Sequence, residues 1–174
     1  MKPLSLGEHA VLALLAEEPR HGWAIARELA TDGDLGRIWR LSHPLAYRAM
    51  DSLAAQRLVR AVGTEPGLGP RRRILTVTAS GRREVDRWLG EPVEHLRDVR
   101  TELLLKLVLS RRIGRDPRPL LRDQQRTFRR IFAALEASTA RSDSDLVDVW
   151  RHESAESVRR FLAAALRAPV SDQG

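Results

Sequence analysis

The chain has 174 residues and a net charge of +7 at neutral pH, with 43% apolar and 30% charged residues. It contains no cysteine, which excludes a disulfide framework, a zinc site with cysteine ligands and a catalytic thiol. The longest uninterrupted apolar run, residues 10–16, is far shorter than the ~20 residues that a membrane-spanning helix needs, and no signal-peptide pattern surrounds it. We therefore expect a cytoplasmic protein of one or two small domains, without a membrane partner and with a charge that suits an anionic partner.

The first two expected helices lie within residues 5–30. Ser5 and Glu8 form an S-x-x-E capping box ahead of the apolar run, which predicts a helix start. Pro19 and Gly22 end this helix and open a short turn. A second helix is expected from about Gly22 to Ala30, and residues 37–41 after it are expected to be extended.

A third helix is expected from Ser42, a good N-cap, to about Arg57. Pro44 fits its first turn. Leu45, Ala49 and Leu53 repeat at helical spacing, so this helix is amphipathic.

After this helix, the spacing of apolar residues along the sequence changes from the period of a helix to that of a strand. Residues 58–62 predict a strand, residues 63–70 are rich in glycine and proline, and residues 71–78 predict a returning strand. Two strands joined by such a loop make a β-hairpin. Thr78 is expected to cap a fourth helix.

The remainder of the chain is expected to be helical. Helices are predicted over residues 96–108, from Asp116 to about residue 135, and from residues 142–145 to about Ala168. The first of these has a predicted apolar face made of Leu96, Val99, Leu103, Leu104, Leu107 and Val108. Apolar stripes this broad favour a helical dimerisation domain.

Three helices followed by a hairpin is the order of a winged helix-turn-helix. The predicted fold class is therefore mainly α with a small β-hairpin wing: a DNA-binding domain over residues 1–90, then a helical dimerisation and effector-binding domain over residues 91–174. In such a fold the third helix enters the major groove and the wing lies along the DNA backbone or minor groove. Residues 37–73, which cover both, hold eight arginines against Asp51 and Glu65.

Three segments resemble motifs of the PadR family of transcriptional regulators. Residues 19–23 (PRHGW) resemble its P-x-H-G-[YW] element, and residues 45–53 (LAYRAMDSL) resemble its T-L-Y-x-x-L-x-x-L pattern. Residues 69–81 (GPRRRILTVTASG) resemble its wing pattern, G-x-x-R-K-x-Y-x-L-T-x-x-G. The chain departs from the family at Pro44 and Arg57, where glycine is usual, at Leu45, where threonine is usual, and at Leu75, where tyrosine is usual.

The resemblance implies a homodimeric repressor that binds a palindromic operator in double-stranded DNA. It also implies a small phenolic or drug-like inducer that releases the DNA. Sequence-indifferent DNA binding, and a helical adaptor that binds proteins instead of DNA, stay open as alternatives.

The candidate DNA contacts lie on the third helix and the wing. Guanidinium groups suit phosphates and the negative potential of a narrow minor groove, and amides at a helix start can also hold a phosphate. Tyr47 either points its hydroxyl at a phosphate or packs within the helix-turn-helix, and Arg48 is expected on a phosphate in preference to a guanine edge. The predicted contacts are Ser42, His43, Tyr47, Arg48, Arg71, Arg72 and Arg73.

Aromatic residues on the later helices are candidates for an effector pocket, because drug-like ligands favour aromatic, apolar cavities. Packing in the core or in a dimer interface is the alternative for each. The candidates are Trp88, Phe128, Phe132 and Trp150.

A second basic block, residues 97–130, holds eleven basic residues against four acidic ones. We hypothesise that its arginines pair with acidic residues of segments 1–36 and 131–174, with added DNA contact as the alternative.

The sequence lacks an H-E-x-x-H zinc motif and a G-x-S-x-G nucleophile motif. We therefore predict no catalytic residues, no metal site and no cofactor.

Overall fold

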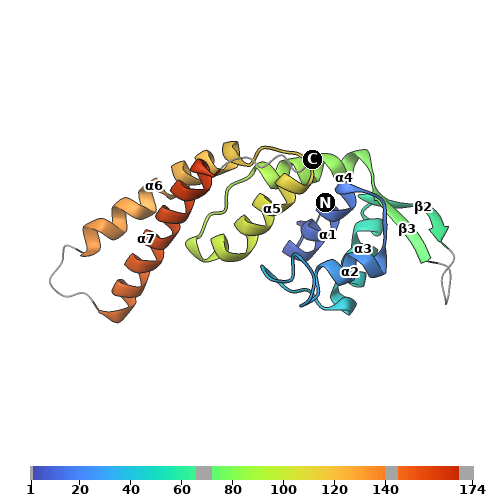
Figure 1. Cartoon of the computed structure of the whole chain (residues 1–174), viewed down its shortest axis with the longest axis horizontal. Helices are drawn as coiled ribbons and strands as arrows, with labels where there is room; N and C mark the ends of the chain where they lie inside the picture. Colours follow the sequence, from blue (N-terminus) through green and yellow to red (C-terminus); the bar gives the residue numbers. More distant parts are fainter. Residues whose placement is uncertain (1, 66–71, 140–144, 169–174) are drawn as a thin grey trace. The chain divides into compact units, whose positions relative to one another are not determined.

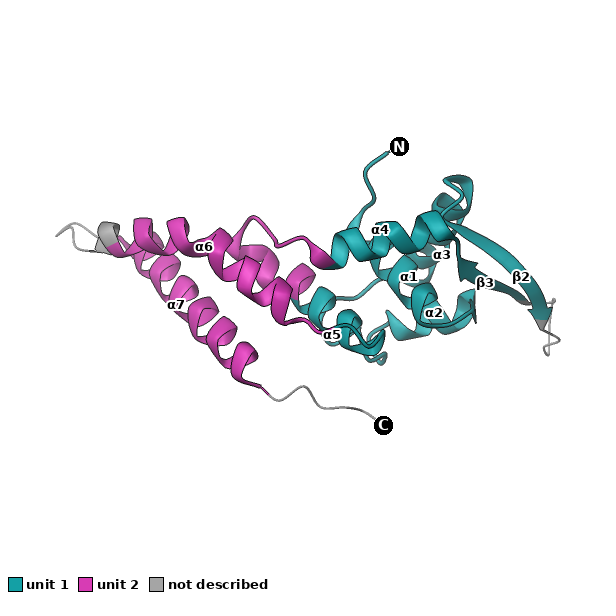
Figure 2. Ribbon diagram, turned by 90° about the horizontal axis from the view of Figure 1, so that it is seen from above, with its two compact units in different colours: residues 1–89, 104–115 teal, residues 90–103, 116–174 magenta. Residues whose placement is uncertain are grey.

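The computed structural model describes residues 2–65, 72–139 and 145–168, and it confirms a mostly helical chain with a small antiparallel sheet (Figure 1). The chain divides into two compact units (Figure 2). The first holds residues 1–89 and 104–115, and the second holds residues 90–103 and 116–174. The division expected at residue 90 differs from this in the segment 104–115. Over the described ranges, no helix combines the length and the apolar character needed to cross a bilayer.

Helix α1 (Leu6–Glu17) forms the centre of the first unit, because its side chains are buried all round. The predicted capping box at its start is confirmed. The amide and hydroxyl of Ser5 donate to Glu8 Oε2 at 2.6 and 2.8 Å, and the Glu8 amide donates to Ser5 Oγ at 3.3 Å. Helix α3, helix α5 and strand β3 all contact α1.

Helices α2 (Gly22–Glu28) and α3 (His43–Ala55) follow, as expected. The extended segment predicted for residues 37–41 is wrong, since turns cover residues 31–38 and no strand forms there. The loop folds back on the end of α2, where the Leu41 amide donates to the Leu29 carbonyl at 2.9 Å. A Cβ at Gly36 would lie 1.7 Å from the Ala30 carbonyl oxygen, so this tight turn requires glycine.

The predicted hairpin is confirmed as strands β2 (Val59–Glu65) and β3 (Arg72–Val77), which pair antiparallel from Val59↔Val77 to Glu65↔Arg72. A bulge interrupts the register between Ala61 and Gly63. A two-residue strand, β1 (Arg20–His21), joins the other edge of β3 and gives the order β1-β3-β2. The sequence predicts only a turn at β1, because two residues are too few to show a strand period.

Helix α4 (Ala79–Gly90) starts as predicted, with the Gly81 amide donating to Thr78 Oγ1 at 3.1 Å. The helical character expected around residues 96–108 is confirmed, but the segment is not a single α-helix. A 3-10 turn (Leu96–Asp98) and a π-helical turn (Val99–Leu103) precede helix α5 (Leu104–Arg112). The wider π turn shifts the helical phase, so Leu105 and Leu109 are buried in the core around α1, whereas Leu107 and Val108 are only partly buried.

Arg112, at the end of α5, joins this helix to α1 and α2. Its Nε lies 2.8 Å from Glu17 Oε1, and its guanidinium lies 3.3 Å from Glu28 Oε2. Arg20 contacts the same two carboxylates at 2.9 and 3.3 Å. Burial favours a lower pKa for Arg112, but the hydrogen bond to Glu28 and the charge of Glu17 raise the pKa above its usual value. The pairing hypothesised for the second basic block is thus confirmed for Arg112.

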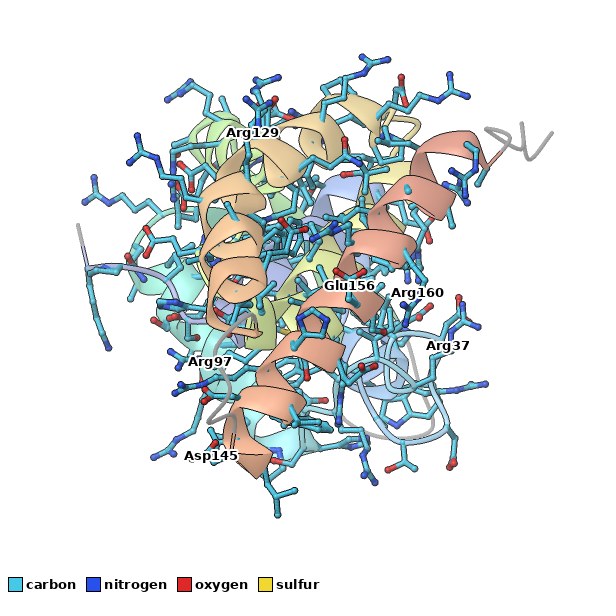
Figure 3. All side chains as sticks on the ribbon, turned by 90° about the vertical axis from the view of Figure 1, so that its left-hand side faces the viewer. Arg37, Arg97, Arg129, Asp145, Glu156 and Arg160 are labelled. Carbon is cyan, nitrogen blue, oxygen red and sulfur yellow. The ribbon has the colours of Figure 1, made fainter. Side chains whose placement is uncertain are left out.

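The second unit is built on helices α6 (Arg118–Thr139) and α7 (Leu146–Arg167), which lie side by side. Asp145 caps α7, with its Oδ1 accepting from the amides of Val147 and Asp148 at 2.9 Å. Figure 3 views this unit with Arg129 on α6 and with Asp145, Glu156 and Arg160 on α7. Phe128 and Leu162 form part of its interior.

Candidate nucleic-acid interface

The surface of α3 divides into a buried face and an outward face. Ala46, Met50 and Leu53 are buried against the first unit. At 3.6 residues per turn, the opposite face carries Pro44, Arg48, Asp51 and Ala55, all of them exposed. Two of these four side chains are small or apolar, so Arg48 and Asp51 supply the polar groups of this outward face.

The start of α3 leaves polar groups accessible. Ser42 occupies the N-cap with extended backbone (φ −66°, ψ 151°), but its hydroxyl forms no capping hydrogen bond. Ser42 and His43 are both exposed. A hydroxyl and free amides at a helix N-terminus can bind a phosphate oxygen.

Tyr47 packs against α2 while keeping part of its surface in solvent. It is 45% exposed, and its Cε1 would lie 3.0 Å from a Cβ placed on Gly22. Met50 would lie 3.2 Å from the same Cβ. Gly22, within the PRHGW segment, therefore allows α2 and α3 to approach closely, and the Tyr47 ring both packs and reaches solvent.

The wing carries an exposed arginine in the same unit as α3. Arg73 is exposed on β3, opposite Thr64 of β2. The backbone of Arg72 pairs with Glu65, while its side chain lies outside the described part. Arg71 lies outside the described residues altogether.

A carboxylate of α1 holds α3 in place, which the sequence did not indicate. Ser52 Oγ donates to Glu8 Oε1 at 2.5 Å, and Glu8 also holds the N-cap of α1. Burial raises the pKa of Glu8, but the hydrogen bonds from Ser52 and Ser5 outweigh burial and lower it below the ordinary 4.5. The two residues lie 44 positions apart, so no local pattern could have revealed the bond.

Helix α2 adds an exposed aromatic side chain to this unit. Trp23 is 43% exposed, and the Arg27 guanidinium lies 5.4 Å from its ring centroid, in a cation–π arrangement. The PRHGW motif that contains Trp23 therefore places an aromatic ring at the surface.

The four aromatic residues predicted for an effector pocket lie in different settings. Trp88 is buried in the first unit, where His9 stacks on it with ring centroids 4.9 Å apart. Phe128 and Phe132 meet edge to face on α6 with centroids 5.9 Å apart. Trp150 is 72% exposed on α7. The structure thus brings the two phenylalanines together.

A shallow hollow of about 320 Å³ lies between α6 and α7, and Phe132 lines it. Arg159 crosses it with its guanidinium 5.2 Å from the Phe132 ring centroid, and Arg159 is paired with Glu136 and Glu156. Across the described ranges, no three acidic or histidine side chains gather in a way that could hold a metal ion.

Comparisons with known proteins agree with this architecture. Residues 11–87 match the family model described as "Transcriptional regulator PadR-like family". A probable transcriptional regulator of Mycobacterium tuberculosis, Rv1176c, is 30% identical over 96 residues, which make up 55% of this chain. That match spans 50% of the length of the Mycobacterium protein.

Among solved structures, Bacillus subtilis PadR in complex with operator DNA is similar, with a TM-score of 0.50. It is 22% identical, and the match covers 94% of this chain and 99% of that one. At this identity the likeness concerns the fold. The fold, the motifs and the family match agree: residues 11–87 are similar to the PadR-like family of transcriptional regulators.

Proposed function

We propose that the protein is a cytoplasmic, homodimeric repressor that binds a palindromic operator in double-stranded DNA. The observation that carries the proposal is the outward face of α3, which is exposed, carries Arg48 and Asp51, and is followed in the chain by the β2–β3 wing with Arg73. In this proposal α3 lies in the major groove and the wing follows the backbone. Two-fold symmetry then predicts half-sites about one helical turn, ~10 bp, apart.

Selection of bound duplexes from a random library by the purified full chain tests the proposal. We expect an inverted-repeat motif, together with a steep fall of log K with log salt of roughly 0.9 for each phosphate contact. Phosphate contacts make the constant for binding to DNA fall with salt, so a constant that does not change with salt would count against DNA as the partner. Steep salt dependence without any sequence preference would instead identify a sequence-indifferent binder.

The repressor part of the proposal is tested by transcription in vitro. The selected site is placed over the promoter of a template, and the transcript is measured with and without the protein. We expect the protein to reduce the transcript, and a template with a scrambled site serves as the control. An increase in transcript from the same template would identify an activator.

The inducer part of the proposal is supported by the hollow that Phe132 lines. A panel of phenolic and planar cationic compounds is added to the protein–operator complex, and release of DNA is followed by fluorescence anisotropy. We expect at least one compound to release wild-type protein but not Phe132→Ala. Retention of DNA with every compound would count against an inducer of these classes.

A further inference from the structure

We propose that Asp51 is a specificity-determining residue, which accepts a hydrogen bond from the N4 amino group of cytosine in the major groove. This inference rests on the proposed function, because it assumes that α3 enters that groove. The sequence predictions assign no role in DNA binding to Asp51.

The first argument is the position of Asp51 on α3. It shares the outward face with Pro44, Arg48 and Ala55, opposite the buried Ala46, Met50 and Leu53. Pro44 and Ala55 have short side chains, so the helix can approach the base edges closely at both ends of this stripe. Arg48 and Asp51, one helical turn apart, are then the two side chains that project furthest into the groove.

The second argument is that three polar side chains near this stripe, on α3 and at its C-cap, make contacts within the protein. Ser52 donates its hydroxyl hydrogen to Glu8, and Gln56 Nε2 donates to Ser52 Oγ at 3.4 Å. Tyr47 rests on α2 beside Gly22. In contrast, within the described ranges the side chain of Asp51 forms neither a hydrogen bond nor an ion pair, and the side chain of Arg48, three residues before it, is equally unengaged.

The third argument is chemical. An ionised carboxylate only accepts hydrogen bonds, and in the major groove the bases that offer a donor are cytosine at N4 and adenine at N6. Adenine also presents the N7 acceptor beside its donor, which repels a carboxylate, so cytosine is the better partner. Phosphates repel the carboxylate as well, so Asp51 weakens binding to every sequence that lacks cytosine at this position. The guanidinium of Arg48 supplies a positive charge one turn away, which offsets that repulsion.

The test compares the base preferences of the wild-type protein, Asp51→Asn and Asp51→Ala, selected from one duplex library at one salt concentration. Asparagine bonds to adenine N6 and N7, so Asp51→Asn is expected to shift the preference at one position of each half-site from cytosine to adenine, by about tenfold. Asp51→Ala is expected to lose the preference there and to bind unrelated DNA more tightly. The matched control is Asp32→Asn, which makes the same change at an exposed residue outside α3 and should leave the motif unchanged.

Unchanged base preference at every position in both Asp51 variants, with a wild-type melting temperature, would overturn the inference and leave the proposed function standing. A wild-type protein that selects no motif would overturn the proposed function itself, and the inference with it. The two failures are therefore distinguishable in a single experiment.

Discussion

At the residue scale, Arg57, in the second position after α3, departs from a family pattern and adopts a strained backbone conformation. Arg57, where the family usually has glycine, adopts φ +58°, in the left-handed region. Its carbonyl oxygen accepts from Thr78 Oγ1 at 2.9 Å, which connects the end of α3 to the start of α4. A residue with a Cβ is strained in this region by about 1 kcal/mol, whereas glycine is not. Arg57 therefore imposes local strain at the junction between α3 and the β2–β3 wing.

The substitution Arg57→Gly is expected to increase the free energy of unfolding by about 0.5–1 kcal/mol, because it removes this strain. Arg57→Ala is the matched control, since it removes the same side chain but keeps the Cβ, and it is expected to bring no gain. Urea unfolding followed by circular dichroism measures both. Equal stability of the glycine and alanine variants would contradict the assignment of strain to the backbone.

Glu8 makes the stability of the first unit depend on pH. Because the pKa of Glu8 in the folded chain lies below its ordinary 4.5, its stabilising effect is complete above about pH 4.5 and is lost as pH falls through the lowered value. Glu8→Gln is expected to lower the free energy of unfolding by about 1–2 kcal/mol at pH 7. The difference should shrink as pH falls below 4.5 towards pH 3, because protonation of wild-type Glu8 removes the charge.

Urea unfolding at pH 7 and pH 3 measures this difference. Glu94→Gln, at an exposed carboxylate, is the control and should match the wild type at both values. A penalty for Glu8→Gln that stays constant across the pH range would mean that the carboxylate charge is not what ties α1 to α3.

At the element scale, the wing and α3 have different expected contributions to the proposed DNA binding. The described side chains of the wing include two exposed arginines, Arg60 and Arg73, and no exposed acidic side chain, so the wing supplies positive charge. The outward face of α3 carries Arg48 and Asp51, which have opposite charges and opposite hydrogen-bonding character. We therefore expect the wing to contribute affinity and α3 to contribute selectivity.

The substitution Arg73→Ala is expected to weaken binding to operator and unrelated DNA by a similar factor. It should also reduce the slope of log K against log salt by roughly 0.9 for each phosphate that the arginine neutralises. Titrations at four salt concentrations with both duplexes measure the two slopes. Arg97→Ala, with the same charge change in the other unit, is the control. A weakening confined to the operator would show that Arg73 reads the shape of the groove or its bases.

The sequence predicted those elements whose signals are local. The capping box at Ser5, the Thr78 cap and the glycine- and proline-rich hairpin all depend on residues within a few positions of one another. The loop before α3, strand β1 and the π-helical turn depend on distant packing, and periodicity alone missed them. The same holds for the candidate interface: spacing placed Arg48 outward, but only the structure showed that Ser52 is bound to Glu8.

At the scale of the whole molecule, the first turns of α7 expose a large apolar surface. Leu146 is 87% exposed and Trp150 is 72% exposed, and Val147 and Val149 between them are at least half exposed. Contiguous apolar patches of this kind mark interaction sites in soluble proteins. A second copy of the chain is the occupant that the proposed palindromic operator requires.

The double substitution Leu146→Glu and Trp150→Glu is expected to convert a dimer into a monomer and to weaken operator binding at least tenfold, since burying such side chains contributes about 1.5–3 kcal/mol each. Light scattering coupled to size-exclusion chromatography measures the mass. Glu153→Gln, an exposed change on the same helix, should remain dimeric. A dimer of unchanged stability in the double variant would place the interface elsewhere.

The assignment of α5 to the first unit has a consequence for how the protein is synthesised. Leu105 and Leu109 complete the core around α1, and Arg112 neutralises Glu17, which lies 95 residues earlier in the chain. A nascent chain that has emerged only as far as the wing therefore carries an unfinished core and a partly buried carboxylate. The first unit closes only after residue 115 has left the ribosome, so translation pauses before that point would prolong its exposure to proteases and chaperones.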